Sequence, residues 1–279
     1  LNAKLIQSND GFSLNNLYEL RYFTDLVNTH SDSAIIGDED WQSGISNLSS
    51  LFQYSSKRDL ALSVIRQFES INPLRKYKSD WKVFLSESKI EDFVEVDSEI
   101  IYVSTIHKAK GKEFNNVFLL LKNFDAVPDD NKRQLYVAIT RAKTNLSIHY
   151  NSEFLRTIDT KGLSYKIDSQ KYNEPKQIGL YLTHRDVQLG YFEFVQQRIE
   201  NLQSGSNLTV IEDGLANARG ELIIKYSKAF KDSLIERQNK GYRLAAAKVN
   251  FIVYWKDEDK GKEVKIILPK MLLSFKPLG

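Results

Sequence analysis

The sequence predicts an α/β domain with a parallel sheet and a helical insertion, followed by a smaller β-rich α+β domain. Continuous apolar runs at residues 100–103, 117–121 and 145–150 are typical of strands that are covered on both faces of a parallel sheet. Residues 12–92 instead repeat apolar side chains three and four positions apart, which is the spacing of amphipathic helices. Strand-like segments dominate again after about residue 178.

These patterns divide the chain into three regions. A length of 279 residues is sufficient for two domains, each with its own core. We expect the α/β domain at residues 1–150 with its helical insertion at 12–92, a polar connector at 151–176, and an accessory domain at 177–279.

The first domain is predicted to begin with a short strand, Ala3 to Gln7, before the helical insertion. The acidic run Asp38-Glu39-Asp40 precedes Trp41 and indicates a helix start, because acidic side chains are favoured at the positive end of the helix dipole. Pro73 interrupts the pattern, and Asp80 is a candidate cap for the last helix of the insertion. A further helix is predicted from about Asp129 to Lys143, between two of the apolar strands.

The accessory domain is predicted to consist mainly of strands. Lys256 to Lys262 is a charged turn that ends in a Gly-Lys pair, so the strands on either side of it are expected to form a hairpin. Two helices are expected, at residues 189–202 and 227–239, the second ending at Gly241. The expected strands are Leu208 to Ile211, Leu222 to Lys225, Ala247 to Trp255 and Glu263 to Leu268.

Composition excludes several kinds of protein. The chain contains no cysteine, so disulfide frameworks and thiol chemistry are absent, and its four histidines are too scattered for a metal site. No metal ligands are therefore predicted. The sequence has no apolar run of about 18 residues, so we expect a cytoplasmic protein without a membrane partner. Because the chain begins at Leu1 rather than Met, we also expect it to be part of a longer protein.

Two stretches carry groups that suit nucleotide chemistry. The first, Val103 to Phe114, follows a predicted strand and combines hydroxyl, imidazole and ammonium groups with a glycine and a glutamate. The second, Arg133 to Lys143, reads Arg-Gln-Leu-Tyr-Val-Ala-Ile-Thr-Arg-Ala-Lys. Its residues Leu135, Ala138, Ile139 and Ala142 are expected to form one apolar helix face, which leaves Arg141 on another side. An arginine in such a position can stabilise charge on a transferring phosphoryl group.

These stretches resemble motifs V and VI of UvrD/PcrA/Rep-type superfamily 1 DNA helicases. The first fits the pattern T-x-H-x-x-K-G-x-E-F, and the second fits Y-V-A-x-T-R-A-K. The resemblance implies that residues 1–150 form the second RecA-like motor domain (P-loop NTPase-type) of an ATP-dependent helicase or translocase. ATP and Mg²⁺ would be bound largely by a first motor domain that this chain lacks, and single-stranded DNA would be the substrate.

The resemblance also assigns roles to individual residues. Arg141 matches the catalytic arginine that reaches the γ-phosphate of ATP, and Glu113 and Gly111 match nucleotide-binding positions near the ribose. In the same motif, Thr105 and His107 match contacts to the DNA backbone. Lys110 matches a neighbouring lysine that we group with these DNA-binding residues without a defined role.

Tyr136 and Thr140 are expected to hold the motif VI helix in place. Lys112 departs from the family pattern, which has leucine at this position. The sequence also contains no G-x-x-x-x-G-K-[ST] phosphate-binding loop. The main alternative is therefore a degenerate motor domain that acts as a DNA- or protein-binding scaffold. A third hypothesis is a nuclease-helicase subunit. The sequence offers no cluster of acidic residues that could bind a metal ion for nuclease chemistry.

The accessory domain matches no family with confidence, and a partner protein is one possible ligand for it. A basic and aromatic surface for single-stranded nucleic acid is an alternative to a purely structural role. The residues that would form this surface are Arg243, Lys248, Tyr254, Trp255, Lys256, Lys262 and Lys265.

Overall fold

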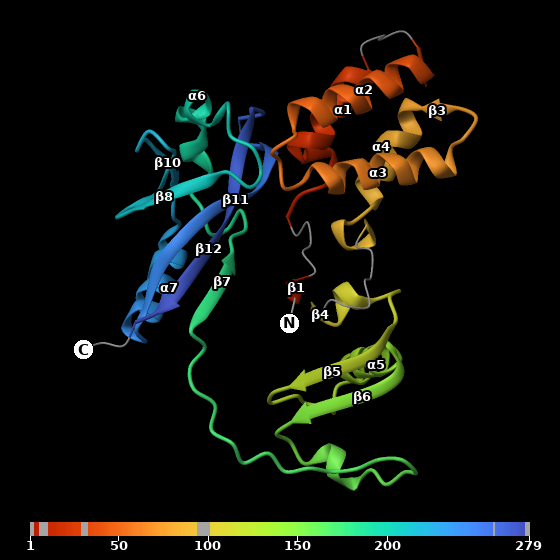
Figure 1. Ribbon diagram of the computed structural model, residues 1–279, viewed down its shortest axis with the longest axis vertical. Coiled ribbons are helices and arrows are strands. Elements are labelled where there is room, and N and C mark those ends of the chain that lie inside the picture. Colours follow the sequence, from red (N-terminus) through yellow and green to blue (C-terminus); the bar gives the residue numbers. More distant parts are fainter. Residues whose placement is uncertain (1–2, 6–10, 29–32, 94–100, 259, 277–279) are drawn as a thin grey trace. The chain divides into compact units, whose positions relative to one another are not determined.

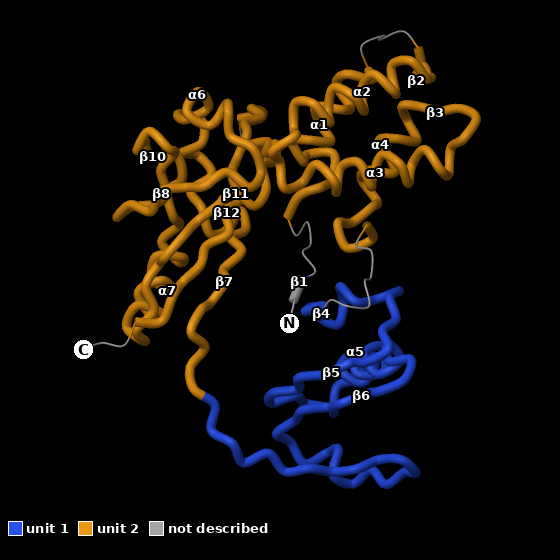
Figure 2. Tube along the Cα trace, in the orientation of Figure 1, with its two compact units in different colours: residues 1–8, 94–172 blue, residues 9–93, 173–279 orange. Residues whose placement is uncertain are grey.

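The computed structural model describes residues 3–5, 11–28, 33–93, 101–258 and 260–276. The chain forms two compact units, each assembled from two separate stretches of sequence (Figure 2). Unit 1 comprises residues 1–8 and 94–172, and unit 2 comprises residues 9–93 and 173–279. The segment that interrupts the first domain along the sequence thus packs in the same unit as the C-terminal residues.

Unit 1 is a mixed α/β structure whose strands pair in parallel (Figure 1). Strand β1 pairs with β4, and β5 pairs with β6. Leu119 and Leu121 of β5 are buried together with Ala138 of α5 and Leu155, so the helix covers one face of the β5–β6 pair. The elements are β1 (Ala3–Leu5), β4 (Ile101–Val103), η3 (His107–Ala109), β5 (Phe114–Leu121), α5 (Asp129–Ile139), β6 (Ala142–Tyr150) and η4 (Phe154–Thr157).

The N-terminal part of unit 2 is a group of four α-helices. Trp41 of α2 makes edge-on contacts with Phe23 of α1 and Trp81 of α4, and the centroids of these ring pairs are 4.9 and 5.5 Å apart. Phe68 of α3 closes the same aromatic cluster, with its ring centroid 5.0 Å from that of Trp81. The elements are η1 (Leu14–Asn16), α1 (Tyr18–Val27), β2 (Ile35–Ile36), α2 (Asp38–Leu51), α3 (Arg58–Ile71), β3 (Lys76–Tyr77), α4 (Lys78–Glu87) and η2 (Ile90–Phe93).

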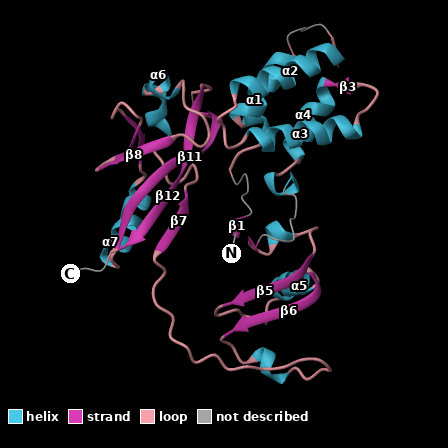
Figure 3. Cartoon of the chain, viewed as in Figure 1, coloured by secondary structure: helices cyan, strands magenta, loops and turns pink. Residues whose placement is uncertain are grey.

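The C-terminal part of unit 2 is built on a six-stranded antiparallel sheet with the order β10-β9-β8-β11-β12-β7 (Figure 3). The long hairpin β11–β12 forms its centre, as the charged turn in the sequence predicts. The elements are β7 (Gln177–Tyr181), η5 (Leu189–Phe194), α6 (Gln196–Ile199), β8 (Asn207–Ile211), β9 (Gly214–Ala216), β10 (Leu222–Lys225), α7 (Lys228–Asn239), β11 (Tyr242–Lys256) and β12 (Glu263–Phe275).

One continuous hydrophobic core joins the helices and the sheet of unit 2. Leu17, directly before α1, forms a β-bridge with Val253 of β11, and the Phe12 and Phe251 rings lie edge-on at 5.3 Å. Polar contacts reinforce this packing. The buried carboxylate of Glu19 accepts hydrogen bonds from the hydroxyls of Ser55 and Ser204, at 2.6 and 2.9 Å.

Most predicted elements are present, with several corrections. Helix α5 ends at Ile139 rather than near Lys143, and Ala142 begins β6, so Ala142 is not part of an apolar helix face. The helix predicted at 189–202 is a 3₁₀ segment followed by the single turn α6. Helix α4 begins at Lys78, so Asp80 lies inside its first turn rather than at the cap.

Two strands of the C-terminal sheet, β7 and β9, have no individual counterpart among the predictions. Residues Ile6 and Gln7 of the predicted first strand and Ile100 of the predicted 100–103 strand lie outside the described residues.

Candidate functional site

The two motif-bearing stretches meet at one edge of the β5–β6 pair. The first is the loop at residues 104–113, which links β4 to β5 and contains η3. The second is the turn at Thr140 and Arg141, which links α5 to β6. Because β5 and β6 are parallel and begin side by side, with Phe114 opposite Ala142, the segments that precede them are neighbours. The backbone amide of Phe114 donates to the carbonyl of Arg141 at 2.9 Å, which fixes the two stretches together.

Arg141 is half-buried, and its guanidinium group makes three hydrogen bonds. The Nε atom donates to the carbonyl of Val137 at 2.9 Å, and Nη2 donates to the hydroxyl of Thr140 at 3.1 Å. The Nη1 atom donates to the carbonyl of Lys112 at 3.3 Å, across the gap between the two stretches. These bonds hold the planar group beside the loop that carries Gly111 and Glu113 and restrict its rotamers.

Gly111 and Glu113 lie on the exposed side of this loop. Gly111 has φ +80°, a left-handed conformation that favours glycine, and a Cβ atom built there would meet no neighbour within 4 Å. The backbone therefore faces open space where another molecule can approach it. The Glu113 carboxylate pairs with the ammonium of Lys143 on β6 at 3.5 Å, and both side chains are more than half exposed.

Thr105, His107 and Lys110 lie on the same loop, and all three are exposed. The turn η3 keeps the loop compact, because the amide of Lys110 donates to the carbonyl of His107 at 3.2 Å. Among the described residues, no hydrogen bond or ion pair joins these three side chains to Arg141 or Glu113. The loop thus has two groups of candidate residues. Gly111 and Glu113 flank the Lys112 carbonyl that Arg141 bonds, whereas Thr105, His107 and Lys110 lie farther along the loop.

One segment of the sequence matches a known family. Residues 100–148 match the UvrD-like helicase C-terminal domain. The matched range begins one residue before β4 and ends within β6, so it contains every candidate site residue named above.

Curated relatives include two subunits of the RecBCD enzyme. The chain is 39% identical to RecB of Chlamydia trachomatis over 70 residues, which are 24% of this chain and 7% of the relative. It is 28% identical to RecD of Buchnera aphidicola subsp. Schizaphis graminum over 158 residues, which are 54% of this chain and 21% of the relative. The chain therefore matches only a small part of each relative's length.

The UvrD-like segment also contains contacts that the sequence did not predict. Lys143 was not a candidate residue, yet its ammonium group is the nearest described partner of Glu113. Only the register of β5 against β6 reveals this pair, because Glu113 and Lys143 are 30 positions apart in the sequence. Thr140 contacts the Arg141 guanidinium directly, whereas Tyr136, expected to hold the helix, is 70% exposed.

The described residues offer no group of three or more histidine, cysteine, aspartate or glutamate side chains that could hold a metal ion. In the same part of the chain, no helix is both long and apolar enough to cross a membrane.

Proposed function

We propose that unit 1 is the second RecA-like motor domain of an ATP-dependent DNA helicase or translocase. In this proposal Arg141 acts as an arginine finger, and Gly111 and Glu113 line the nucleotide. The phosphates of ATP and the Mg²⁺ ion are bound mainly by another motor domain, which carries the phosphate-binding loop. The 279 residues contain no G-x-x-x-x-G-K-[ST] loop of this kind. Both curated relatives are named as subunits of a RecBCD enzyme, which supports an assembly in which the site is completed by further protein.

The observation that carries this proposal is the anchoring of Arg141. Its guanidinium group is fixed to the carbonyls of Val137 and Lys112 and to the Thr140 hydroxyl, yet the side chain stays half-exposed. An arginine that served only as a surface ion-pair partner would be expected to face a carboxylate. Among the described residues, Arg141 forms no ion pair, so its positive charge remains available for an incoming anion.

The loop beside Arg141 fits a nucleotide. Gly111 leaves the backbone accessible, and the Glu113 carboxylate can accept hydrogen bonds from the hydroxyl groups of a sugar. ATP supplies the energy-releasing cleavage of its terminal phosphate, and Arg141 would stabilise the negative charge that develops in this cleavage.

Thr105, His107 and Lys110 are proposed to contact the backbone of single-stranded DNA. Hydroxyl, imidazole and ammonium groups can all bind phosphate oxygens, and the three side chains are exposed on one loop. Contacts of this kind carry no sequence information, so binding through this loop is expected to tolerate any DNA sequence. Because the same loop also carries Gly111 and Glu113, a change at the nucleotide can reach the DNA contacts through a few residues.

The test is Arg141→Ala in the complete protein that carries this chain. We expect strand-stimulated ATP turnover to fall by about 10³-fold or more, while single-strand binding and thermal stability change little. The matched control is Arg133→Ala, since Arg133 lies on the same helix and makes only an exposed ion pair with Asp130. Near-normal turnover in Arg141→Ala would remove this residue from the ATP site.

The alternative, a degenerate motor that acts as a scaffold, predicts a different result. The complete protein would then bind DNA or protein without strand-stimulated ATP hydrolysis, and neither arginine variant would change anything measured in this assay.

A further inference from the structure

One row of exposed side chains crosses four strands of the unit 2 sheet. Lys248 of β11 lies directly opposite Lys270 of β12, and this pair is flanked by Asn207 of β8 and Tyr181 of β7. Side chains at opposed positions of neighbouring antiparallel strands point to the same face of a sheet. All four residues are exposed, and Tyr181 is 41% exposed.

The next set of opposed residues along these strands shows which face of the sheet carries the two lysines. Leu208, Ala247, Met271 and Leu180 lie opposite one another on the same four strands, and all of them belong to or pack against the hydrophobic core. Phe230 and Leu234 of α7 also belong to or pack against this core. The row with the two lysines is therefore on the opposite face.

We propose that this face is a second binding surface for single-stranded DNA, separate from the loop at residues 104–113. We call it the lysine row, defined by Asn207, Lys248, Lys270 and Tyr181. Lys248 and Lys270 would bind neighbouring phosphates, and the Tyr181 ring at the edge strand would stack on a base.

The unneutralised lysine pair is the main argument for an anionic ligand. Like charges directly opposite each other on neighbouring strands destabilise a sheet. Neither Lys248 nor Lys270 forms an ion pair or a side-chain hydrogen bond with any described residue, so nothing in this part of the chain offsets their repulsion. A strand of phosphates would offset it, because each phosphate carries one negative charge.

A second row on the same face has small or aliphatic side chains, which leaves this face accessible to an extended polymer. Beside the lysine row lie Ala246 of β11, Leu272 of β12 and Gly179 of β7, which oppose one another and have short or aliphatic side chains. The Cε2 atom of the Tyr181 ring lies 3.9 Å from the position that a Cβ atom would occupy at Gly179. The ring thus lies close to the sheet at Gly179, where an exposed aromatic side chain can stack on a base.

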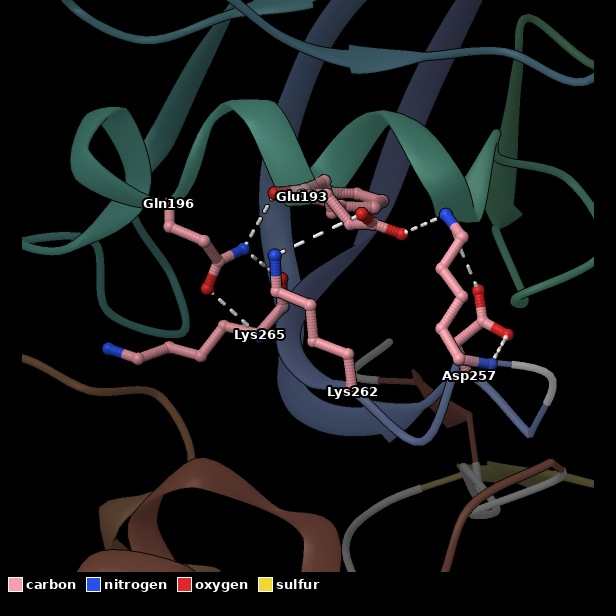
Figure 4. Close-up of polar contacts among 7 residues, drawn as sticks. Glu193, Gln196, Asp257, Lys262 and Lys265 are labelled. Carbon is pink, nitrogen blue, oxygen red and sulfur yellow. Dashed lines mark hydrogen bonds and ion pairs between the residues drawn. The ribbon is translucent and has the colours of Figure 1, made fainter.

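Three other basic residues of the hairpin, Lys260, Lys262 and Lys265, make contacts inside unit 2. The ammonium of Lys265 lies 4.0 Å from the centre of the Tyr18 ring, and Arg21 lies over Tyr254 at 5.4 Å. Around the turn, Lys262 and Lys260 pair with the Glu193 carboxylate on η5, and Gln196 bonds the backbone of Lys265 (Figure 4). Of the basic and aromatic surface predicted from the sequence, only Lys248 belongs to the lysine row.

The choice of DNA over another polyanion rests on the proposed function and on Tyr181, since an acidic peptide offers no bases to stack. The proposal does not depend on the ATP site, because all four residues lie in unit 2. The experiment can therefore fail for the lysine row while the motor proposal stands.

The test measures binding of a fluorescent oligothymidylate of about 16 nucleotides. This length is near the largest number of nucleotides that one small single-strand-binding domain covers. The double variant Lys248→Gln/Lys270→Gln of the whole chain is expected to bind about tenfold more weakly at low salt. The slope of the logarithm of the binding constant against the logarithm of the salt concentration should become shallower by about 1.4. This is about 0.7 for each of the two phosphate contacts removed. The matched control is Lys82→Gln/Lys228→Gln, which removes the same charge from exposed positions on α4 and α7. If both double variants lose affinity equally, net charge explains the loss and the proposal is overturned.

Tyr181 separates DNA from other anions. We expect Tyr181→Phe to keep the affinity and Tyr181→Ala to lose about fivefold or more, since stacking needs the ring but not its hydroxyl. Poly-glutamate that competes as well as oligothymidylate would overturn the assignment to DNA in favour of an acidic protein segment. Preferred binding of duplex would overturn the assignment to single strands.

Discussion

The two units of this chain differ in how much core supports them. Among its described residues, unit 1 buries the small cluster of Leu119, Leu121, Ala138 and Leu155, and Phe118 and Leu120 of β5 are 69% and 79% exposed. Unit 2 buries a continuous core that contains Trp41, Trp81, Phe23 and Phe68 and includes residues of both strands of the β11–β12 hairpin. The candidate nucleotide and loop DNA residues all lie in the thinly packed unit. Loops that bind ligands and change conformation are commonly found where local stability is low.

This comparison predicts that the units respond differently to loss of a core side chain. Trp41→Ala removes the centre of the aromatic cluster in unit 2, and we expect it to lower the free energy of unfolding by about 3–5 kcal/mol. Urea denaturation followed by circular dichroism measures this change. Leu119→Ala in unit 1 is the matched substitution, with an expected loss of about 2 kcal/mol, because its site is smaller and 8% exposed.

Hydrogen exchange resolved by peptide decides whether the two units are independent. Trp41→Ala should accelerate exchange in residues 11–93 and 173–276 and leave β5 and β6 unchanged, whereas Leu119→Ala should do the reverse. Equal acceleration in both units for either variant would show one cooperative structure, and the comparison between a thin and a thick core would fail.

A second prediction concerns Glu19, which lies within the core that joins the helices to the sheet of unit 2. Burial raises the pKa of its carboxyl group above the usual value, and hydrogen bonds from Ser55 and Ser204 oppose this effect. A raised pKa means that the folded protein keeps a proton that the unfolded chain releases. The stabilisation is therefore complete below the unfolded pKa near 4.5 and is lost as the pH rises through the folded pKa.

Glu19→Gln should abolish the loss of stability that the parent protein shows as the pH rises. The amide oxygen can still accept from both serine hydroxyls, and no charge needs to be buried, so we expect the variant to be more stable at pH 8 by about 1 kcal/mol. At pH 4 the two proteins should have similar stability. Thermal unfolding from pH 4 to pH 8 measures the difference, with the exposed Glu236→Gln as control. A variant that is less stable than the parent at pH 8 would mean that the buried carboxylate is stabilising.

The sequence predicted unit 1 better than unit 2, for a physical reason. Local patterns indicate strands β4, β5 and β6, because each is a short apolar run. The predicted end of α5, near Lys143, was wrong because Ala142 fits a helical apolar face as well as it fits the first position of β6. For the candidate site, the motifs indicated Arg141 and Glu113, but only tertiary structure reveals the Lys143 partner and the Lys112 carbonyl.

The sheet of unit 2 could not be derived by alternation alone. The β11–β12 ladder shifts register between Leu244 and Ala246 and again between Val249 and Phe251. Each such bulge reverses which side chains face the core, so counting every second residue from Trp255 does not identify the face of Lys248. The packing of residues 9–93 with residues 173–279 also depends on contacts between segments far apart in sequence, such as Leu17 with Val253.

The smallest expected effect tests how the exposed ion pair between Glu113 and Lys143 contributes to the proposed nucleotide site. Lys143→Met removes the partner of Glu113, and because both side chains are more than half exposed, stability should change by less than about 1 kcal/mol. In the complete protein we expect the KM for ATP to change by about two- to fivefold and kcat to change little, since the contacts of Arg141 remain. Lys132→Met, which breaks an exposed pair with Asp129 on α5, is the control.

The effect of Lys143→Met should also fade as salt concentration rises, because exposed charges are screened. A fall in kcat comparable with that of Arg141→Ala would contradict this assignment. It would mean that Lys143 acts on the transferring phosphate itself, so that unit 1 would contribute two cations to the ATP site rather than one.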